Sequence, residues 1–123
     1  MISILFIFLA SLCNSIMDKT SHHFHKSIFK NLNPVWWNAE ISWKNKYILL
    51  DPKNGRRKLL FFNYPVQLTD AWHFFKTLMI IFICLAIIFY QSIFNWYFDL
   101  LIFGTCWNLT FSLFYSYLFK NLK

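Results

Sequence analysis

The residues from Thr77 to Tyr90 form an apolar run without a single charged side chain. Extended back to Asp70, this run is long enough to cross a bilayer core, which needs about 20 helical residues. A soluble domain is typically about one quarter charged. Here 14% of the residues are charged and 58% are hydrophobic. The sequence therefore excludes a soluble enzyme, a disordered tail and a secreted disulfide scaffold, and predicts a single all-α integral membrane domain over residues 1–123.

Three segments are predicted to be transmembrane helices: residues 1–17, 70–90 and 96–119. No basic residue precedes the first apolar segment, as it would in a signal peptide, so we expect an uncleaved first helix. Lysine and arginine are concentrated in residues 18–68 and absent from the turn at 91–95. The positive-inside rule then places the amino terminus outside and both the 18–68 loop and the carboxyl terminus in the cytoplasm, as in a bacterial inner-membrane protein.

The cytoplasmic loop combines aromatic and basic residues. The apolar spacing within residues 21–32 predicts an amphipathic helix at the membrane surface, followed by an interfacial anchor rich in tryptophan and lysine. The turn signal Asp51-Pro52-Lys53-Asn54-Gly55 predicts a small β-hairpin. The net charge is +7, and a basic loop between spans is expected to face anionic lipid and not nucleic acid. The candidate contacts to anionic headgroups are Lys44, Lys46, Arg56 and Arg57.

Acidic and histidine residues gather where the first two spans are expected to reach the cytoplasm. A continuous first helix would place Asp18, His22 and His25 on one face, and Asp70 and His73 share a face at the start of the second span. Imidazoles and carboxylates bind zinc, manganese and iron. This set predicts a divalent metal site that activates water against a phosphorylated lipid-like substrate. In the alternative interpretation Asp70 caps its helix and the histidines are headgroup-level polar residues.

The third span carries small and polar residues at every fourth position, which places them on one helix face. Such a stripe allows close helix packing in lipid. The alternative function is therefore a non-catalytic membrane protein that packs with itself or with a larger membrane complex. Asp99 is expected to reach the outer surface, and Leu101 is expected on a different face. The stripe consists of Gly104, Asn108, Ser112 and Ser116.

Two sequence strings resemble a family of small uncharacterised multi-span membrane proteins from bacteria and their phages: Ser42-Trp43-Lys44-Asn45-Lys46-Tyr47 and Leu68-Thr69-Asp70-Ala71-Trp72-His73. The resemblance covers about residues 8–90 and implies a small multi-span membrane protein. It assigns no reaction and no catalytic residue. The further matching residues are Asn14, Asp18, His22-His23, Ser27-Ile28-Phe29 and Trp37-Asn38.

Overall fold

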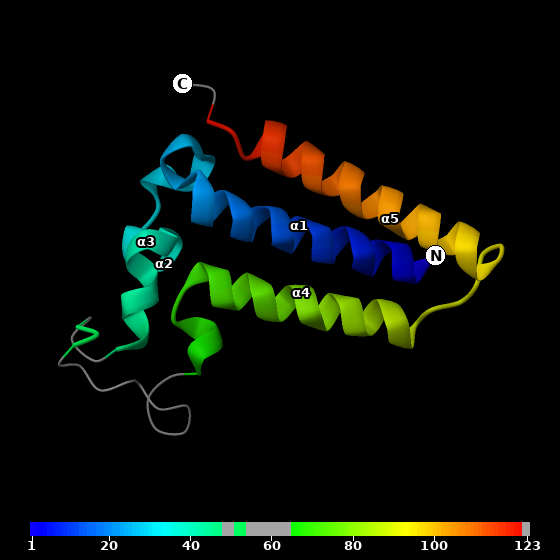
Figure 1. Cartoon of the computed structure of the whole chain (residues 1–123), viewed down its shortest axis with the longest axis horizontal. Helices are drawn as coiled ribbons and strands as arrows, with labels where there is room; N and C mark the ends of the chain where they lie inside the picture. Colours follow the sequence, from blue (N-terminus) through cyan, green and yellow to red (C-terminus); the bar gives the residue numbers. More distant parts are fainter. Residues whose placement is uncertain (48–50, 54–64, 122–123) are drawn as a thin grey trace.

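The computed structural model describes residues 1–47, 51–53 and 65–121, and the regular elements within them are all helical (Figure 1). Three helices are long and apolar enough to cross a membrane. They are α1 (Ile2–His22), α4 (Ala71–Ile88) and α5 (Trp96–Ser112), which continues as a π-helical segment, Leu113–Leu118. The expected all-α fold with three candidate spans is confirmed. The expected β-hairpin falls largely on residues 48–50 and 54–64, which lie outside the described part of the chain.

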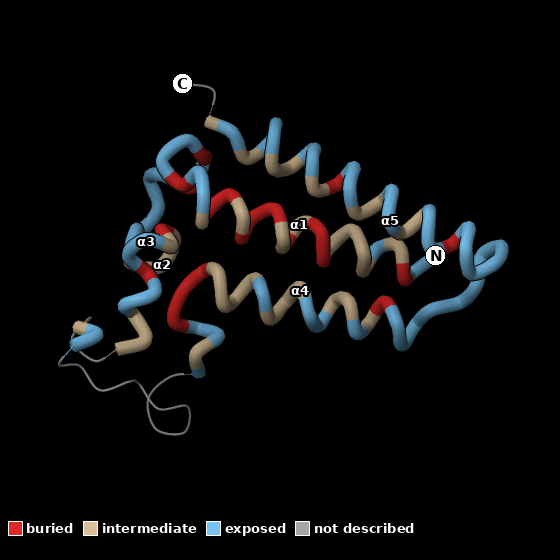
Figure 2. The backbone as a smooth tube through the Cα atoms, in the orientation of Figure 1, coloured by how far each residue is buried: buried red, intermediate tan, exposed pale blue. Residues whose placement is uncertain are grey.

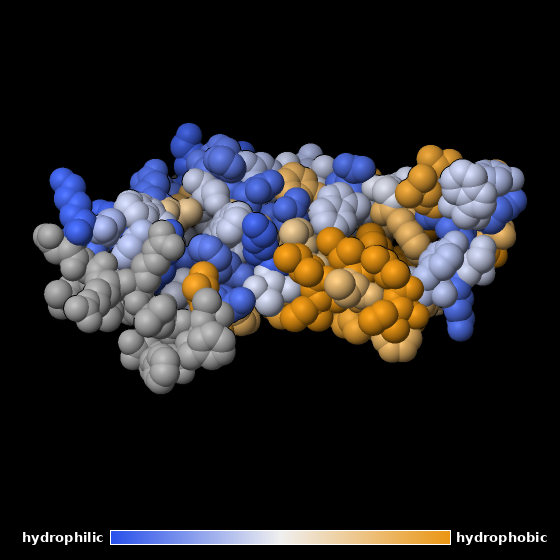
Figure 3. Space-filling model, turned by 60° about the horizontal axis from the view of Figure 1, so that its bottom comes forward, coloured by the Kyte–Doolittle hydropathy of each residue, from blue (hydrophilic) through white to orange (hydrophobic). Residues whose placement is uncertain are grey.

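Helix α1 lies between α4 and α5 and packs against both (Figure 1). In its most apolar stretch 44% of the residues are buried, compared with 11% in each of the other two helices. The outward faces of α4 and α5 are covered with exposed isoleucine, leucine and aromatic side chains. Figures 2 and 3 show the consequence: burial is concentrated on α1, and an apolar band covers the molecule on the α4 side. Exposed apolar bands of this kind are typical of helices that face lipid.

Small side chains on α1 allow the neighbouring helices to approach closely. Ala10, Ser11 and Ser15 are fully buried. The Ser11 hydroxyl donates to the Trp107 carbonyl of α5 at 2.7 Å, and the Ser3 hydroxyl donates to the Phe89 carbonyl just after α4 at 2.8 Å. Small residues and hydroxyl hydrogen bonds are the usual means by which helices associate in lipid. The packing seam of the bundle therefore belongs to α1.

The stripe predicted on the third span does not form this seam. Gly104, Asn108, Ser112 and Ser116 are all exposed. A Cβ atom added at Gly104 would meet no heavy atom within 4 Å. Within the chain, therefore, the third helix does not pack through the stripe, because α1 supplies the small side chains and α5 turns other residues toward it.

The amphipathic helix predicted at residues 21–32 is also not formed. Helix α1 continues past residue 17 to His22 and is followed by two 3-10 turns, Phe24–Lys26 and Ile28–Asn31. Ser27 separates the turns with an extended backbone, and its side chain accepts a hydrogen bond from the Phe29 N–H at 3.1 Å. Serine competes for backbone hydrogen bonds in this way and disfavours helix interiors.

Phe24 and Phe29, two apolar residues of this segment, are buried in a small core with Ile16. The Phe29 ring stacks on Trp37 with 4.9 Å between centroids and lies 5.1 Å from Phe119. Backbone hydrogen bonds from Ile28 to Phe119 and from Asn121 to Lys26 attach the carboxyl-terminal end here. The segment after α1 thus joins the first and third long helices.

Short helices complete this end of the molecule. Asn33 caps α2 (Pro34–Trp37), and Asn38 caps α3 (Ala39–Ser42) by accepting a backbone N–H from Glu40. Asparagine is among the preferred residues at both cap positions. Two 3-10 turns, Trp43–Lys46 and Val66–Leu68, follow along the described chain before α4 begins.

Candidate functional site at the start of α4

Asp70 begins α4 as its N-cap residue. Its backbone is extended, with φ −157° and ψ 163°, and Oδ1 accepts the His73 backbone N–H at 2.8 Å. A carboxylate here satisfies a free helix N–H and interacts favourably with the helix dipole. The side chain is almost fully buried, with 1% of the residue exposed. The capping role considered from the sequence is confirmed.

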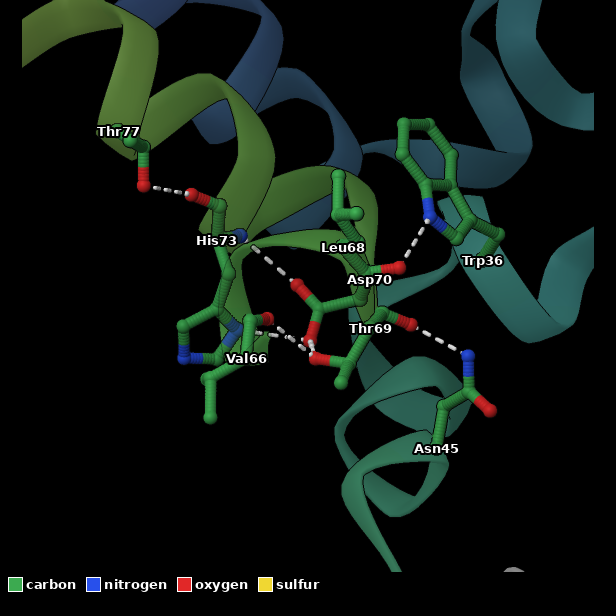
Figure 4. A network of polar contacts seen from close by, with 8 residues as sticks. All are labelled: Trp36, Asn45, Val66, Leu68, Thr69, Asp70, His73 and Thr77. Atoms are coloured by element: carbon green, nitrogen blue, oxygen red, sulfur yellow. Dashed lines mark hydrogen bonds and ion pairs between the residues drawn. The ribbon is translucent and has the colours of Figure 1, made fainter. Parts of the chain in front are cut away.

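The second carboxylate oxygen of Asp70 holds the His73 ring. Oδ2 lies 2.7 Å from Nδ1 of His73 (Figure 4). Because a carboxylate can only accept, Nδ1 carries the hydrogen of this bond, and a neutral ring then has a free lone pair on Nε2. The Thr69 hydroxyl donates to the Val66 carbonyl at 2.7 Å and lies 3.2 Å from the same Oδ2. The aspartate therefore fixes both the position and the tautomer of the histidine.

Two residues from the preceding short helices hold the backbone that leads into Asp70 (Figure 4). The Asn45 side-chain amide donates to the Thr69 carbonyl, and Trp36 Nε1 donates to the Leu68 carbonyl at 3.4 Å. The Trp36 ring also packs against Phe74 of α4, with 5.9 Å between centroids. Trp36 and Asn45 thus hold the start of α4 in place.

A pocket of about 240 Å³ opens beside Asp70 and His73. Trp43, Trp72 and Ala39 supply its apolar walls. Ser42 also lines it and is only 2% exposed, and no described residue makes a hydrogen bond with its hydroxyl. The complete lining is Ser21, Ala39, Ser42, Trp43, Asp70, Trp72 and His73.

The structure does not assemble the five predicted metal ligands. Because α1 ends at His22, His25 lies in a separate 3-10 turn and shares no continuous helix face with Asp18. His22 and His25 are exposed and line a different pocket of about 270 Å³. Within residues 1–47, 51–53 and 65–121, no group of three or more histidine, cysteine, aspartate or glutamate side chains is placed to hold a metal ion. Of the predicted set, the structure brings together Asp70 and His73.

Two of the four basic residues predicted to contact headgroups, Lys44 and Lys46, have an aromatic neighbour, and so does Lys76, which lies outside the predicted set. Lys44 and Lys46 lie 5.8 and 5.9 Å from the Trp43 ring, and Lys76 lies 4.5 Å from Trp72. These are cation–π distances. Arg56 and Arg57 belong to the part of the chain that the structure does not describe.

A second buried carboxylate, Asp99, lies at the opposite end of the bundle. It is 1% exposed and accepts hydrogen bonds from the Tyr90 hydroxyl at 2.8 Å and the Ser92 hydroxyl at 3.0 Å. The backbone N–H groups of Ile93 and Phe94 donate to it at 3.0 and 3.2 Å. The expectation that this residue reaches the outer surface is wrong, because four donors in the α4–α5 connection surround it.

Lys19 is a further residue whose role the sequence did not indicate. It is 5% exposed, its Nζ donates to the Tyr115 carbonyl at 2.8 Å, and it lies 4.6 Å from the Tyr115 ring. The carbonyl is accessible because the π-helical segment directs the Phe119 N–H to Phe114. The Tyr115 hydroxyl lies 2.8 Å from Nδ1 of His23. Lys19 therefore joins α1 to the end of the third long helix.

Comparisons with known proteins return no family model, no curated protein and no solved structure that matches the chain.

Proposed function

We propose that the chain is a small, non-catalytic integral membrane protein that assembles through the outward face of α5. Its three long helices cross the membrane with the amino terminus outside and the carboxyl terminus in the cytoplasm. In this arrangement the stripe predicted from the sequence contacts a helix of another molecule instead of a helix of its own chain.

The observation that carries this proposal is the exposed polar stripe in the middle of an apolar helix. The Asn108 side chain is exposed, and its amide nitrogen donates to the Gly104 carbonyl at 2.8 Å. Its amide oxygen has no hydrogen-bond partner in the described part of the chain. A polar group exposed to hydrocarbon is costly, and intramembrane polar residues normally face a partner or a cavity. A groove beside Asn108 provides the space for such a partner.

A second copy of the chain is the partner that this face fits. A carboxamide is both donor and acceptor, so Asn108 can pair with Asn108 of a second copy across a twofold axis. The open surface at Gly104 allows the two backbones to approach closely. Ser112 and Ser116 continue the same exposed face toward the helix end.

The test is the Gly104→Leu variant of the full-length protein. A Cβ atom at this position meets no heavy atom within 4 Å, and the residue is exposed, so we expect the monomer to fold unchanged. Between two copies it would separate the backbones, and we expect the dimer fraction to fall about tenfold or more, by the usual sensitivity of close helix contacts. The measurement is the monomer–dimer equilibrium in lipid nanodiscs or mild detergent, followed by energy transfer between labelled copies.

The matched control is Ile80→Phe, which enlarges an exposed side chain on α4. Leu101 is unsuitable as a control, although the sequence placed it on another face, because it lines the same groove as Gly104 and Asn108. A wild-type protein that remains monomeric at all protein-to-lipid ratios would contradict the proposal. An equal loss of dimer in both variants would contradict the assigned face.

A further inference from the structure

The pocket at the start of α4 contains two polar groups that the fold does not use. One is the Ser42 hydroxyl, and the other is Nε2 of His73, which points away from Asp70 in Figure 4. The His73 side chain is 33% exposed, so its free nitrogen is accessible from the pocket. Both groups are accessible from the pocket, where a ligand with matching polar groups can form hydrogen bonds with them.

Ser42 contributes a hydroxyl group to the pocket lining. Its residue is 2% exposed, yet no described residue pairs with its hydroxyl. Every fully buried side-chain nitrogen or oxygen in the described chain has a hydrogen-bond partner, so the unpaired Ser42 hydroxyl retains some accessible surface, and Ser42 lines this pocket. A hydroxyl in this position can donate to a ligand carbonyl.

His73 provides the complementary acceptor. The bond from Nδ1 to Asp70 holds the ring in one orientation and leaves the lone pair of a neutral ring on Nε2. A ligand hydroxyl can donate to that lone pair. Because Asp70 is itself fixed as the cap of α4, the acceptor is held in place before any ligand arrives.

The charge of the pocket favours a neutral ligand over an anionic one. The pocket lining contains the Asp70 carboxylate and neither lysine nor arginine, and among the described residues the ion-pair partner of Asp70 is His73. Lys44, Lys46 and Lys76 approach Trp43 and Trp72, but none of the three lines the pocket. An anionic headgroup would therefore be repelled by the Asp70 carboxylate. The Ser42 hydroxyl and His73 Nε2 can instead pair with the uncharged carbonyl and hydroxyl groups of a neutral ligand.

We infer that this pocket binds a neutral glycerolipid that carries a free hydroxyl, the class to which diacylglycerol belongs. The hydroxyl donates to His73 Nε2, an ester carbonyl accepts from Ser42, and an acyl chain lies against Trp43 and Trp72. Indole rings favour the boundary between headgroups and hydrocarbon, where this part of such a lipid resides.

The inference is tested with a photoreactive diacylglycerol added to the full-length protein in nanodiscs, followed by mapping of the labelled peptides. We expect labelling of peptides that contain residues 39–43 or 70–73. Two probes with the same chains provide the ligand controls: a methyl ether that lacks the hydroxyl hydrogen, and a phosphatidic acid. Loss of one hydrogen bond predicts about tenfold weaker binding of the methyl ether, by the usual worth of a hydrogen bond to an oriented acceptor.

Protein variants complete the test. His73→Phe keeps an aromatic ring but removes Nε2, and Ser42→Ala removes the hydroxyl, so both should weaken labelling by the diacylglycerol probe. His25→Phe changes an exposed histidine outside the pocket and should not. Equal binding of the methyl ether and the hydroxyl probe by the wild-type protein would overturn the inference, whatever the variants do. Stronger labelling by phosphatidic acid, or no label at the pocket, would overturn it as well.

Discussion

Asp70 caps α4 with Oδ1 and holds the His73 ring with Oδ2, and substitutions of Asp70 can separate these two roles. Asp70→Asn keeps an N-cap acceptor but no longer offers a carboxylate to His73, whereas Asp70→Ala removes both interactions. We expect Asp70→Ala to lower the free energy of unfolding by about 1 kcal/mol or more, the usual cost of losing an N-cap, and Asp70→Asn to lower it less. Helix content followed during titration with a denaturing detergent measures both. Equal stability of the alanine variant and the wild type would contradict the capping role.

Asp99 also shapes the ionisation of a neighbour. The hydrogen bond that Tyr90 donates to Asp99 raises the pKa of the Tyr90 phenol above its usual value. The contact therefore stabilises the folded chain below the unfolded pKa of tyrosine and is lost as the pH rises through the raised pKa. In Asp99→Asn we expect the pKa of Tyr90 to fall. The tyrosinate absorbance of each protein, minus that of its Tyr90→Phe counterpart, gives the titration, and an unchanged midpoint would contradict the assignment.

Individual residues also show what sequence can and cannot reveal about the site. The spacing of three between Asp70 and His73 predicted their contact, because both lie on one helix turn. His25 does not share a helix face with Asp18, because α1 ends at His22 and His25 lies in the 3-10 turn that follows. The four donors around Asp99 come from a turn whose conformation no helical periodicity describes.

At the scale of elements, the sequence located the three apolar helices but not the way in which they pack. Four-residue spacing on α5 predicts a stripe but does not indicate what the stripe faces. The serines of α1 lie within an apolar segment, whose hydropathy predicts a span but not a packing face. The central position of α1 becomes clear from tertiary contacts, since its hydroxyls reach carbonyls of the two neighbouring helical segments. Hydrophobic forces do not select between faces in lipid, so polar and small residues decide the packing.

The contact between Lys19 and the π-helical end of α5 gives a prediction at this scale. Lys19→Met fills a similar volume but cannot donate to the Tyr115 carbonyl. We expect the free energy of unfolding to fall by about 1 kcal/mol, the size of a polar contact between membrane helices. Titration with a denaturing detergent provides the measurement. Lys30→Met, which changes an exposed lysine, serves as the control and should unfold like the wild type.

The whole molecule has one basic end and one end without basic residues. Helices α1 and α5 run in the same direction, and α4, which comes between them in sequence, runs in the opposite direction. The amino terminus and the α4–α5 connection therefore lie at the same end of the molecule (Figure 1). The described lysines of the loop, from Lys26 to Lys53, follow the other end of α1, and Lys120 follows α5. Crossing a membrane would separate the two ends, and the positive-inside rule predicts a cytoplasmic location for the basic end.

Cysteine labelling in intact cells tests this orientation. Lys53 and Gln91 are exposed at opposite ends, and each can be replaced by cysteine after removal of Cys13, Cys84 and Cys106. We expect a membrane-impermeant maleimide to label Gln91→Cys in intact cells and Lys53→Cys only after the cells are permeabilised. The reverse labelling pattern would show that the protein has the opposite orientation in the membrane. Labelling of both positions in intact cells would show that the connection between them does not cross the membrane, and with it the lipid-facing role of α4 would fail.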